Sequence, residues 1–115
     1  LPELTCLAGK SAAEKLAFLS GAISISPSID YLERAYDDAK YGRPSRRPFF
    51  TPCVPTVVDP DLAPQGKHVI SIFGGHAPYE LQGATWDVER EKVADSVLDE
   101  FERYRTYSTG TRLGA

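Results

Sequence analysis

The chain has 115 residues, of which 42% are hydrophobic and 25% are charged, as in ordinary soluble globular proteins. This length favours a single domain. The 16 acidic residues outnumber the 13 lysines and arginines, and the net charge of −3 argues against a nucleic-acid partner. No apolar run approaches the roughly 20 residues of a membrane span, and no signal peptide is recognisable. We therefore expect a cytoplasmic protein.

Cysteine usage and the first residue carry two further expectations. Cys6 and Cys53 lie far apart, outside any CxxC pair and without a histidine at metal-ligand spacing. We expect two reduced thiols, with a disulfide as the alternative, and no metal site. The chain begins at Leu1 and contains no methionine. This favours a fragment of a longer protein.

Two short elements are predicted in the first part of the chain. The segment "SAAEKLAFLSG" has the capping-box residues Ser11 and Glu14 and a terminating glycine, which indicate a short helix. The segment "GAISIS" at 21–26 alternates apolar and polar residues. This alternation predicts a strand with one buried face, formed by Ile23 and Ile25.

Two longer amphipathic helices are predicted from apolar residues at helical spacing. The first lies between the N-cap candidate Ser28 and the glycine at 42, and the second covers residues 86–104. The apolar stripe of the first is Ile29, Leu32, Ala35, Tyr36 and Ala39, and that of the second is Val93, Ala94, Val97, Leu98, Phe101 and Tyr104.

Two extended segments lie between these helices. The segment "FFTPCVPTVV" contains Pro52 and Pro55, which cannot donate to a β-ladder, so we expect an edge strand or one with irregular pairing. The segment "KHVISIFGG" has apolar groups on both faces, which is typical of a central strand. We expect Leu32 and Leu98 to cover its two faces from the helices.

The order strand, helix, strand, strand, helix predicts an α+β fold with a three-stranded mixed sheet, half of a ferredoxin-like pattern. A right-handed crossover through the first long helix would set the first two strands parallel, with the third antiparallel. We divide the chain into an uncertain N-terminal segment 1–20, an α+β unit 21–104 and a tail 105–115 that we expect to be frayed or disordered.

The glycine pair at the end of "VISIFGGHAPY" raises the question of a phosphate loop. A dinucleotide site needs GxGxxG directly between a strand and a helix. Here Gly74 and Gly75 stand alone, Pro78 follows, and no helix is indicated before Trp86. We therefore expect no phosphate site at this pair, which instead permits close approach of another backbone or a ligand.

Charged residues near the first long helix allow two interpretations. Arg43, Arg46 and Arg47 lie in the turn "RPSRRP", which favours a solvated loop, with an anion or phosphate contact as the alternative. Asp37 and Asp38 are adjacent on a helix and so point apart. We expect both carboxylates to be solvated and not to share a proton.

Three sequence blocks carry a resemblance to a known family. They are "SIDYLERAYDDAKYG", "DPDLAPQGKHVISIF", and "APYEL" followed by "TWDVEREKVADSVLDEFERY". In order and spacing they resemble phytoene-desaturase-like FAD-dependent oxidoreductases, in the branch of the pyridine nucleotide-disulfide oxidoreductase domain-containing protein 2 type. The resemblance covers about residues 21–104. It implies a fragment of the substrate-binding domain, in which a sheet and helices lie over a flavin domain.

The resemblance implies a parent that uses FAD to dehydrogenate an apolar small molecule. The family's flavin motifs are absent here, so we expect no cofactor in this chain, no catalytic residue and an incomplete enzyme. The candidates for lining a substrate cavity are Phe73, His76 and Tyr79. The same apolar face, if uncovered, favours a homo-oligomer.

Two other functions remain open from the residues themselves. The chain could be a self-standing α+β binding or dimerisation module. It could also be a small enzyme in which His76 acts with an acid such as Asp59 or Glu80, although no nucleophile motif accompanies that histidine.

Overall fold

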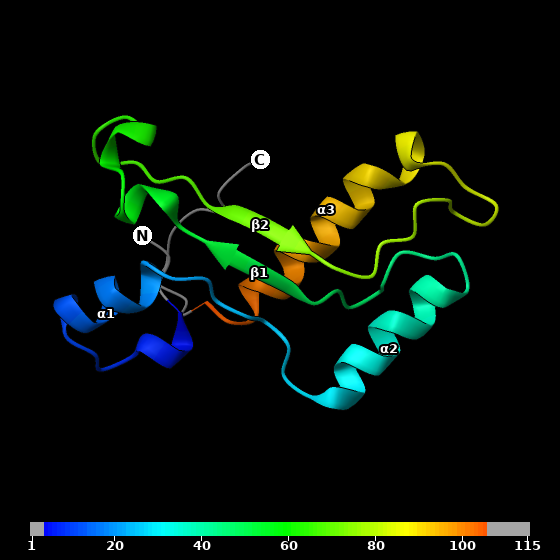
Figure 1. The fold of residues 1–115 in the computed structure, drawn as a ribbon, viewed down its shortest axis with the longest axis horizontal. Coiled ribbons are helices and arrows are strands. Elements are labelled where there is room, and N and C mark those ends of the chain that lie inside the picture. The colour runs from blue at the N-terminus through cyan, green and yellow to red at the C-terminus, as the bar shows by residue number, and fades with distance from the viewer. Residues whose placement is uncertain (1–3, 106–115) are drawn as a thin grey trace.

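The computed structural model of the chain describes residues 4–105 and contains helices around a small sheet (Figure 1). Residues 106–115, which make up most of the tail expected to be frayed, lie outside the described residues. The longer elements are helix α1 (Ala12–Leu19), helix α2 (Ile29–Lys40), strand β1 (Phe50–Cys53), strand β2 (Ser71–Gly74) and helix α3 (Trp86–Glu102). Short 3₁₀ helices lie at Thr5–Leu7, Pro55–Val57 and Pro60–Leu62.

The predicted helices are confirmed, and the caps of α1 and α2 explain where those two helices begin. At the start of α1, the Glu14 amide donates to the Ser11 hydroxyl over 3.2 Å and the Ser11 amide donates to the Glu14 carboxylate over 2.8 Å. This reciprocal pair is the capping box that the sequence indicates. At the start of α2, the Ser28 hydroxyl accepts from the Tyr31 amide over 3.1 Å.

The sheet differs from the prediction. Only β1 and β2 form it within residues 4–105, and they run antiparallel, with Phe50 opposite Gly74 and Cys53 opposite Ser71. The third strand of the expected mixed sheet is absent there. Segment 21–26 instead meets β1 at one isolated bridge, between Ile25 and Phe50, and this bridge is antiparallel. The α+β class holds, but the three-stranded mixed sheet and the parallel pairing are wrong.

Proline at position 52 explains why segment 21–26 does not extend into a strand. Ile25 and Phe50 exchange two backbone hydrogen bonds, of 2.9 and 3.4 Å. Two residues along, the Ile23 amide donates to the Pro52 carbonyl over 3.0 Å, but proline has no N–H to donate in return. The ladder therefore stops after one bridge. Segment 21–26 still docks on this side of β1 through the isolated bridge, so β1 shows the irregular pairing expected of a strand with Pro52 in it.

The hydrophobic core lies around Phe50, which is fully buried. The aromatic rings of Phe50 and Phe101 pack edge to face with centroids 6.3 Å apart, and α3 passes behind the two strands in Figure 1. This contact brings the end of α3 to the sheet. The other buried members of the core come from the N-terminal half and the end of β1: Leu4, Leu7, Leu19, Ile23, Ile25 and Val54.

Strand β2 and its approach are buried on one side only. Ile70 and Ile72 pack against the core, whereas Val69 is 42% exposed and Phe73 is 78% exposed. The expectation of a central strand covered on both faces is therefore wrong. Strand β2 pairs with β1 on one side only, and the face that carries Phe73 remains exposed.

The two long helices also turn different residues inward than expected. In α2 the buried residues are Tyr31, Ala35 and Asp38, while Ile29 and Tyr36 are exposed. In α3 the buried pair is Glu100 and Phe101, and Leu98 of the predicted stripe is exposed. Two charged side chains, Asp38 and Glu100, thus point inward, while several members of the predicted apolar stripes remain exposed.

The unequal burial of two neighbouring α3 residues predicts unequal costs of truncation. Phe101→Ala removes a ring packed on Phe50, so we expect a loss of roughly 3–5 kcal/mol in the free energy of unfolding. Leu98→Ala removes a side chain that is 38% exposed and should cost about 1 kcal/mol or less. Urea unfolding of both variants measures this, and equal losses would mean that α3 is rotated about its axis.

Candidate functional site

A buried carboxylate on α2 organises the arginine-rich loop at 43–48. Asp38 is 4% exposed. It accepts from the Arg46 amide over 3.1 Å, and its second oxygen lies 3.3 Å from Arg46 Nη2 and 3.5 Å from Arg43 Nη2. The expectation of a solvated Asp38 is wrong, because the loop folds back over the carboxylate.

These contacts keep Asp38 ionised despite its burial. Burial alone would raise the pKa of Asp38, but the hydrogen bonds from Arg46 and the positive charges of Arg46 and Arg43 outweigh it. The pKa of Asp38 is therefore lowered. The carboxylate and its two arginines form a structural ion pair and do not form a general acid or base.

A second buried carboxylate joins the same loop to α3. The Arg47 guanidinium donates to both carboxylate oxygens of Glu100, with Nη2–Oε1 at 2.9 Å and Nε–Oε2 at 3.3 Å. Arg103 reaches the same carboxylate, with Nε 3.2 Å from Oε2. Fork-shaped pairing of this kind fixes direction as well as distance. Glu100 is 3% exposed while the Arg47 side chain is 55% exposed, so a buried carboxylate is bound by an arginine from the surface.

Tyr31 completes the packing between α2 and the loop. Its hydroxyl donates to the Pro48 carbonyl over 2.6 Å, and the Arg47 guanidinium lies 5.3 Å from the centre of its ring. Burial raises the pKa of Tyr31, and the nearby charge of Glu100 raises it further. The phenol is therefore a fixed neutral hydrogen-bond donor.

Between α2 and this loop lies a cleft of about 670 Å³. We name it the arginine cleft after its most frequent charged residue. Sequence reasoning did not find it, although the anion-contact interpretation of "RPSRRP" named two of its residues. The lining consists of Pro27, Ser28, Asp30, Tyr31, Arg34, Ala35, Asp38, Arg46 and Arg47.

The predicted substrate-cavity residues lie elsewhere, after β2. His76 has a positive φ of 58°, and its carbonyl accepts from the Ser45 hydroxyl over 3.2 Å. Its ring meets Tyr36 and Phe49 edge-on, with centroids 5.5 and 5.0 Å away. At Gly75 the Phe49 ring occupies the space that a Cβ would need. A close approach thus occurs at this glycine, but it is made by an aromatic side chain and not by the backbone or ligand expected.

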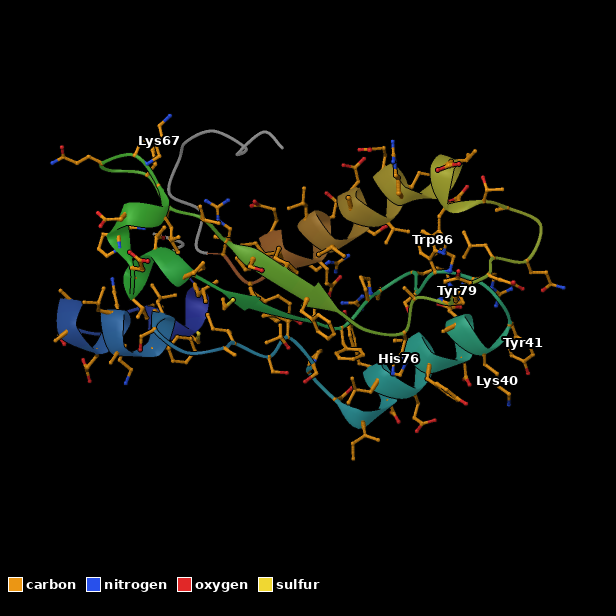
Figure 2. The ribbon with its side chains drawn as sticks, turned by 45° about the horizontal axis from the view of Figure 1, so that its top comes forward. Lys40, Tyr41, Lys67, His76, Tyr79 and Trp86 are labelled. Atoms are coloured by element: carbon orange, nitrogen blue, oxygen red, sulfur yellow. The ribbon has the colours of Figure 1, made fainter. Side chains whose placement is uncertain are left out.

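The other two candidates point into solvent. Phe73 is 78% exposed and Tyr79 is 94% exposed, and neither they nor His76 line the arginine cleft. Tyr79 stands next to Trp86, whose indole N–H donates to the carbonyls of Pro78 and Tyr79 over 3.0 and 3.1 Å (Figure 2). Trp86 therefore anchors the start of α3 to this loop and not to the core.

The remaining candidates have structural positions. His68 Nδ1 lies 3.0 Å from the Thr56 hydroxyl, a contact that holds its ring within the fold. Cys6 and Cys53 are free thiols. Among residues 4–105 no group of three or more potential metal ligands comes together. No helix in that range combines the length and the apolar character that crossing a bilayer requires.

The Asp38 cluster predicts a stability that depends on pH. Because folding lowers the Asp38 pKa, its contribution is present at neutral pH and is lost as pH falls below the usual value of 3.8 toward the folded-state pKa. Asp38→Asn should lower the free energy of unfolding at pH 7 by roughly 1–3 kcal/mol. Urea unfolding at pH 7 and pH 3 measures the difference.

The control for this prediction is Asp37→Asn on the exposed face of the same helix. We expect a change within about 0.5 kcal/mol there. An equal loss in the two variants, or a loss at Asp38 that persists unchanged at pH 3, would contradict the buried ion pair.

Comparison with known proteins identifies relatives for part of the chain. No family model matches it, and no solved structure matches it. Pyridine nucleotide-disulfide oxidoreductase domain-containing protein 2 is 45% identical over 75 residues in Rattus norvegicus and 44% identical over 75 residues in Mus musculus. The matched part is 64% of this chain but 13% of either relative. The chain is thus similar, over a small part of their length, to proteins named as oxidoreductase-domain proteins, as its three sequence blocks predict.

Proposed function

We propose that the chain is part of the substrate-binding domain of an FAD-dependent, phytoene dehydrogenase-like oxidoreductase, and that it is catalytically incomplete alone. The observation that carries this proposal is the 45% identity to an oxidoreductase-domain protein. The matched segment makes up 13% of that protein's length. A segment of that size supplies part of one domain. The flavin, the substrate and the reaction belong to the proposed parent protein.

The exposed apolar surface supports a position inside a larger assembly. Phe73 on the bare face of β2 and Tyr79 in the following loop are almost fully exposed, as is Ile29 on α2 at 78%. Large apolar side chains in water favour a covering partner. In the proposed parent, Phe73, His76 and Tyr79 would face the flavin domain or an apolar substrate.

The first test is flavin binding by the chain itself. We expect this 115-residue chain to bind no FAD, because a dinucleotide site places the pyrophosphate at a glycine-rich helix N-terminus and the chain has no GxGxxG. Equilibrium dialysis against FAD, read by flavin absorbance at stoichiometric protein, measures this.

The matched control is the longer product of the same reading frame, which should retain flavin under the same conditions. Stoichiometric flavin on the 115-residue chain would contradict the proposal that the cofactor site lies outside it. A longer product that is colourless and remains so with added FAD would contradict the flavin-dependent assignment.

The alternative function is a self-standing module that dimerises or binds through its apolar face, and the exposure of Phe73 favours it. The isolated chain should then form a two-fold homodimer, which Phe73→Ser weakens at least tenfold because burying one such side chain contributes roughly 1.5–3 kcal/mol. Light scattering over a dilution series measures the dimer, with exposed Val58→Ser as the control. A monomer at high micromolar concentration would contradict the dimer.

A further inference from the structure

We propose that the arginine cleft binds a phosphate-bearing small molecule with at least two negative charges. The cleft is built by α2 and the loop at 43–48, and the three residues proposed to face a substrate lie outside it. This site is therefore separate from the proposed substrate face. It does not depend on the flavin assignment.

The first argument is the charge around the cleft. Each of the two buried carboxylates, Asp38 and Glu100, is held by two arginines. One positive charge therefore remains in each cluster after neutralisation. Arg34 and Asp30, which also line the cleft, add one charge of each sign. The cleft and its supporting ion pairs thus carry a surplus of two positive charges in a chain whose net charge is −3.

The second argument is the supply of hydrogen-bond donors. Arg34 lines the cleft, and no ion pair or hydrogen bond of its guanidinium is present among residues 4–105. Arg46 and Arg47 each use two guanidinium nitrogens on their carboxylates, which leaves donors on both. The planar guanidinium matches the oxygens of a phosphoryl group in a two-point contact.

The third argument is that two of the three arginines are held in place before any ligand arrives. Arg47 is fixed by Glu100 and by the Tyr31 ring, and Arg46 is fixed by Asp38 through both its amide and its guanidinium. Such pairing reduces the side-chain entropy that binding would otherwise cost. The buried carboxylates therefore position the arginines and do not consume them.

The size of the cleft narrows the ligand class. A volume of about 670 Å³ exceeds what one phosphate needs and falls within the range of small-molecule sites. Two fixed arginines and Arg34 suit two adjacent phosphoryl groups. Inorganic pyrophosphate and a nucleoside diphosphate share this chemistry.

The test is calorimetric titration of the whole chain with pyrophosphate and, separately, with ADP at low ionic strength. We expect saturable one-to-one binding that weakens with added salt. Arg34→Gln should weaken it at least tenfold, because a hydrogen bond to a charged group is lost. Arg34 has no ion-pair or hydrogen-bond partner among residues 4–105, so this variant should keep the wild-type thermal unfolding curve.

The matched control is Arg90→Gln, which removes the same charge from α3 outside the cleft lining. We expect less than a twofold change there. Tighter binding of ADP than of pyrophosphate would assign the site to nucleotides, and equal binding would assign it to the diphosphate group alone. Either result supports the proposal.

Three outcomes would overturn it. Absence of saturable binding of both ligands at millimolar concentration is the first. Equal weakening by Arg34→Gln and Arg90→Gln is the second, because it would show attraction to overall charge and not to the cleft. Succinate binding as tightly as pyrophosphate is the third, because it would show no preference for phosphoryl groups.

Discussion

The two-point ion pair between Arg47 and Glu100 is the constraint on which the arrangement of the helices depends. It joins residues 53 positions apart and fixes the end of α3 against the loop that follows α2. Glu100 is buried, so removing Arg47 would leave its charge with one arginine in place of two, in a poorly solvated position. The same loop carries Arg46 to Asp38 and the Pro48 carbonyl to Tyr31. The contact between α2 and the rest of the fold is therefore largely polar.

Local chemistry made the helices predictable, and one missing donor made the sheet unpredictable. The caps at Ser11 and Ser28 act within three residues, so their pattern in the sequence is sufficient to place α1 and α2. The proline at 52 was correctly read as a break in a ladder. The side of β1 on which that break falls depends on where segment 21–26 docks. That docking is a long-range contact, which no local pattern specifies.

Of the candidate site, the sequence predicted the arginines and an anion contact as one alternative, but not the cleft. Three arginines in a turn favour either solvent or an anion. Asp38 lies only eight residues before Arg46, but Glu100, the partner of Arg47, lies 53 residues away, where no local pattern indicates it. The apolar stripe of α2 also gives a wrong prediction of which residues are buried. A two-stranded sheet is too small to cover every apolar face, so Asp38 with its arginines takes the inward position while Ile29 stays outside. The apolar spacing still marks a face that requires a cover.

The arginine cleft and the exposed apolar surface at Phe73 and Ile29 can act independently of each other. The lining of the arginine cleft and the ion pairs that shape it all lie within residues 27–103, so the cleft does not need another part of a protein to form. By contrast, Phe73 on β2 and Ile29 on α2 are each 78% exposed. Covering the apolar surface, whether by the remainder of a longer oxidoreductase or by a second copy, would leave the carboxylate-held arginines where they are. Helix α2 belongs to both surfaces, because it carries Arg34 in the cleft lining and the exposed Ile29. A ligand in the cleft would therefore contact the same helix that a covering partner contacts.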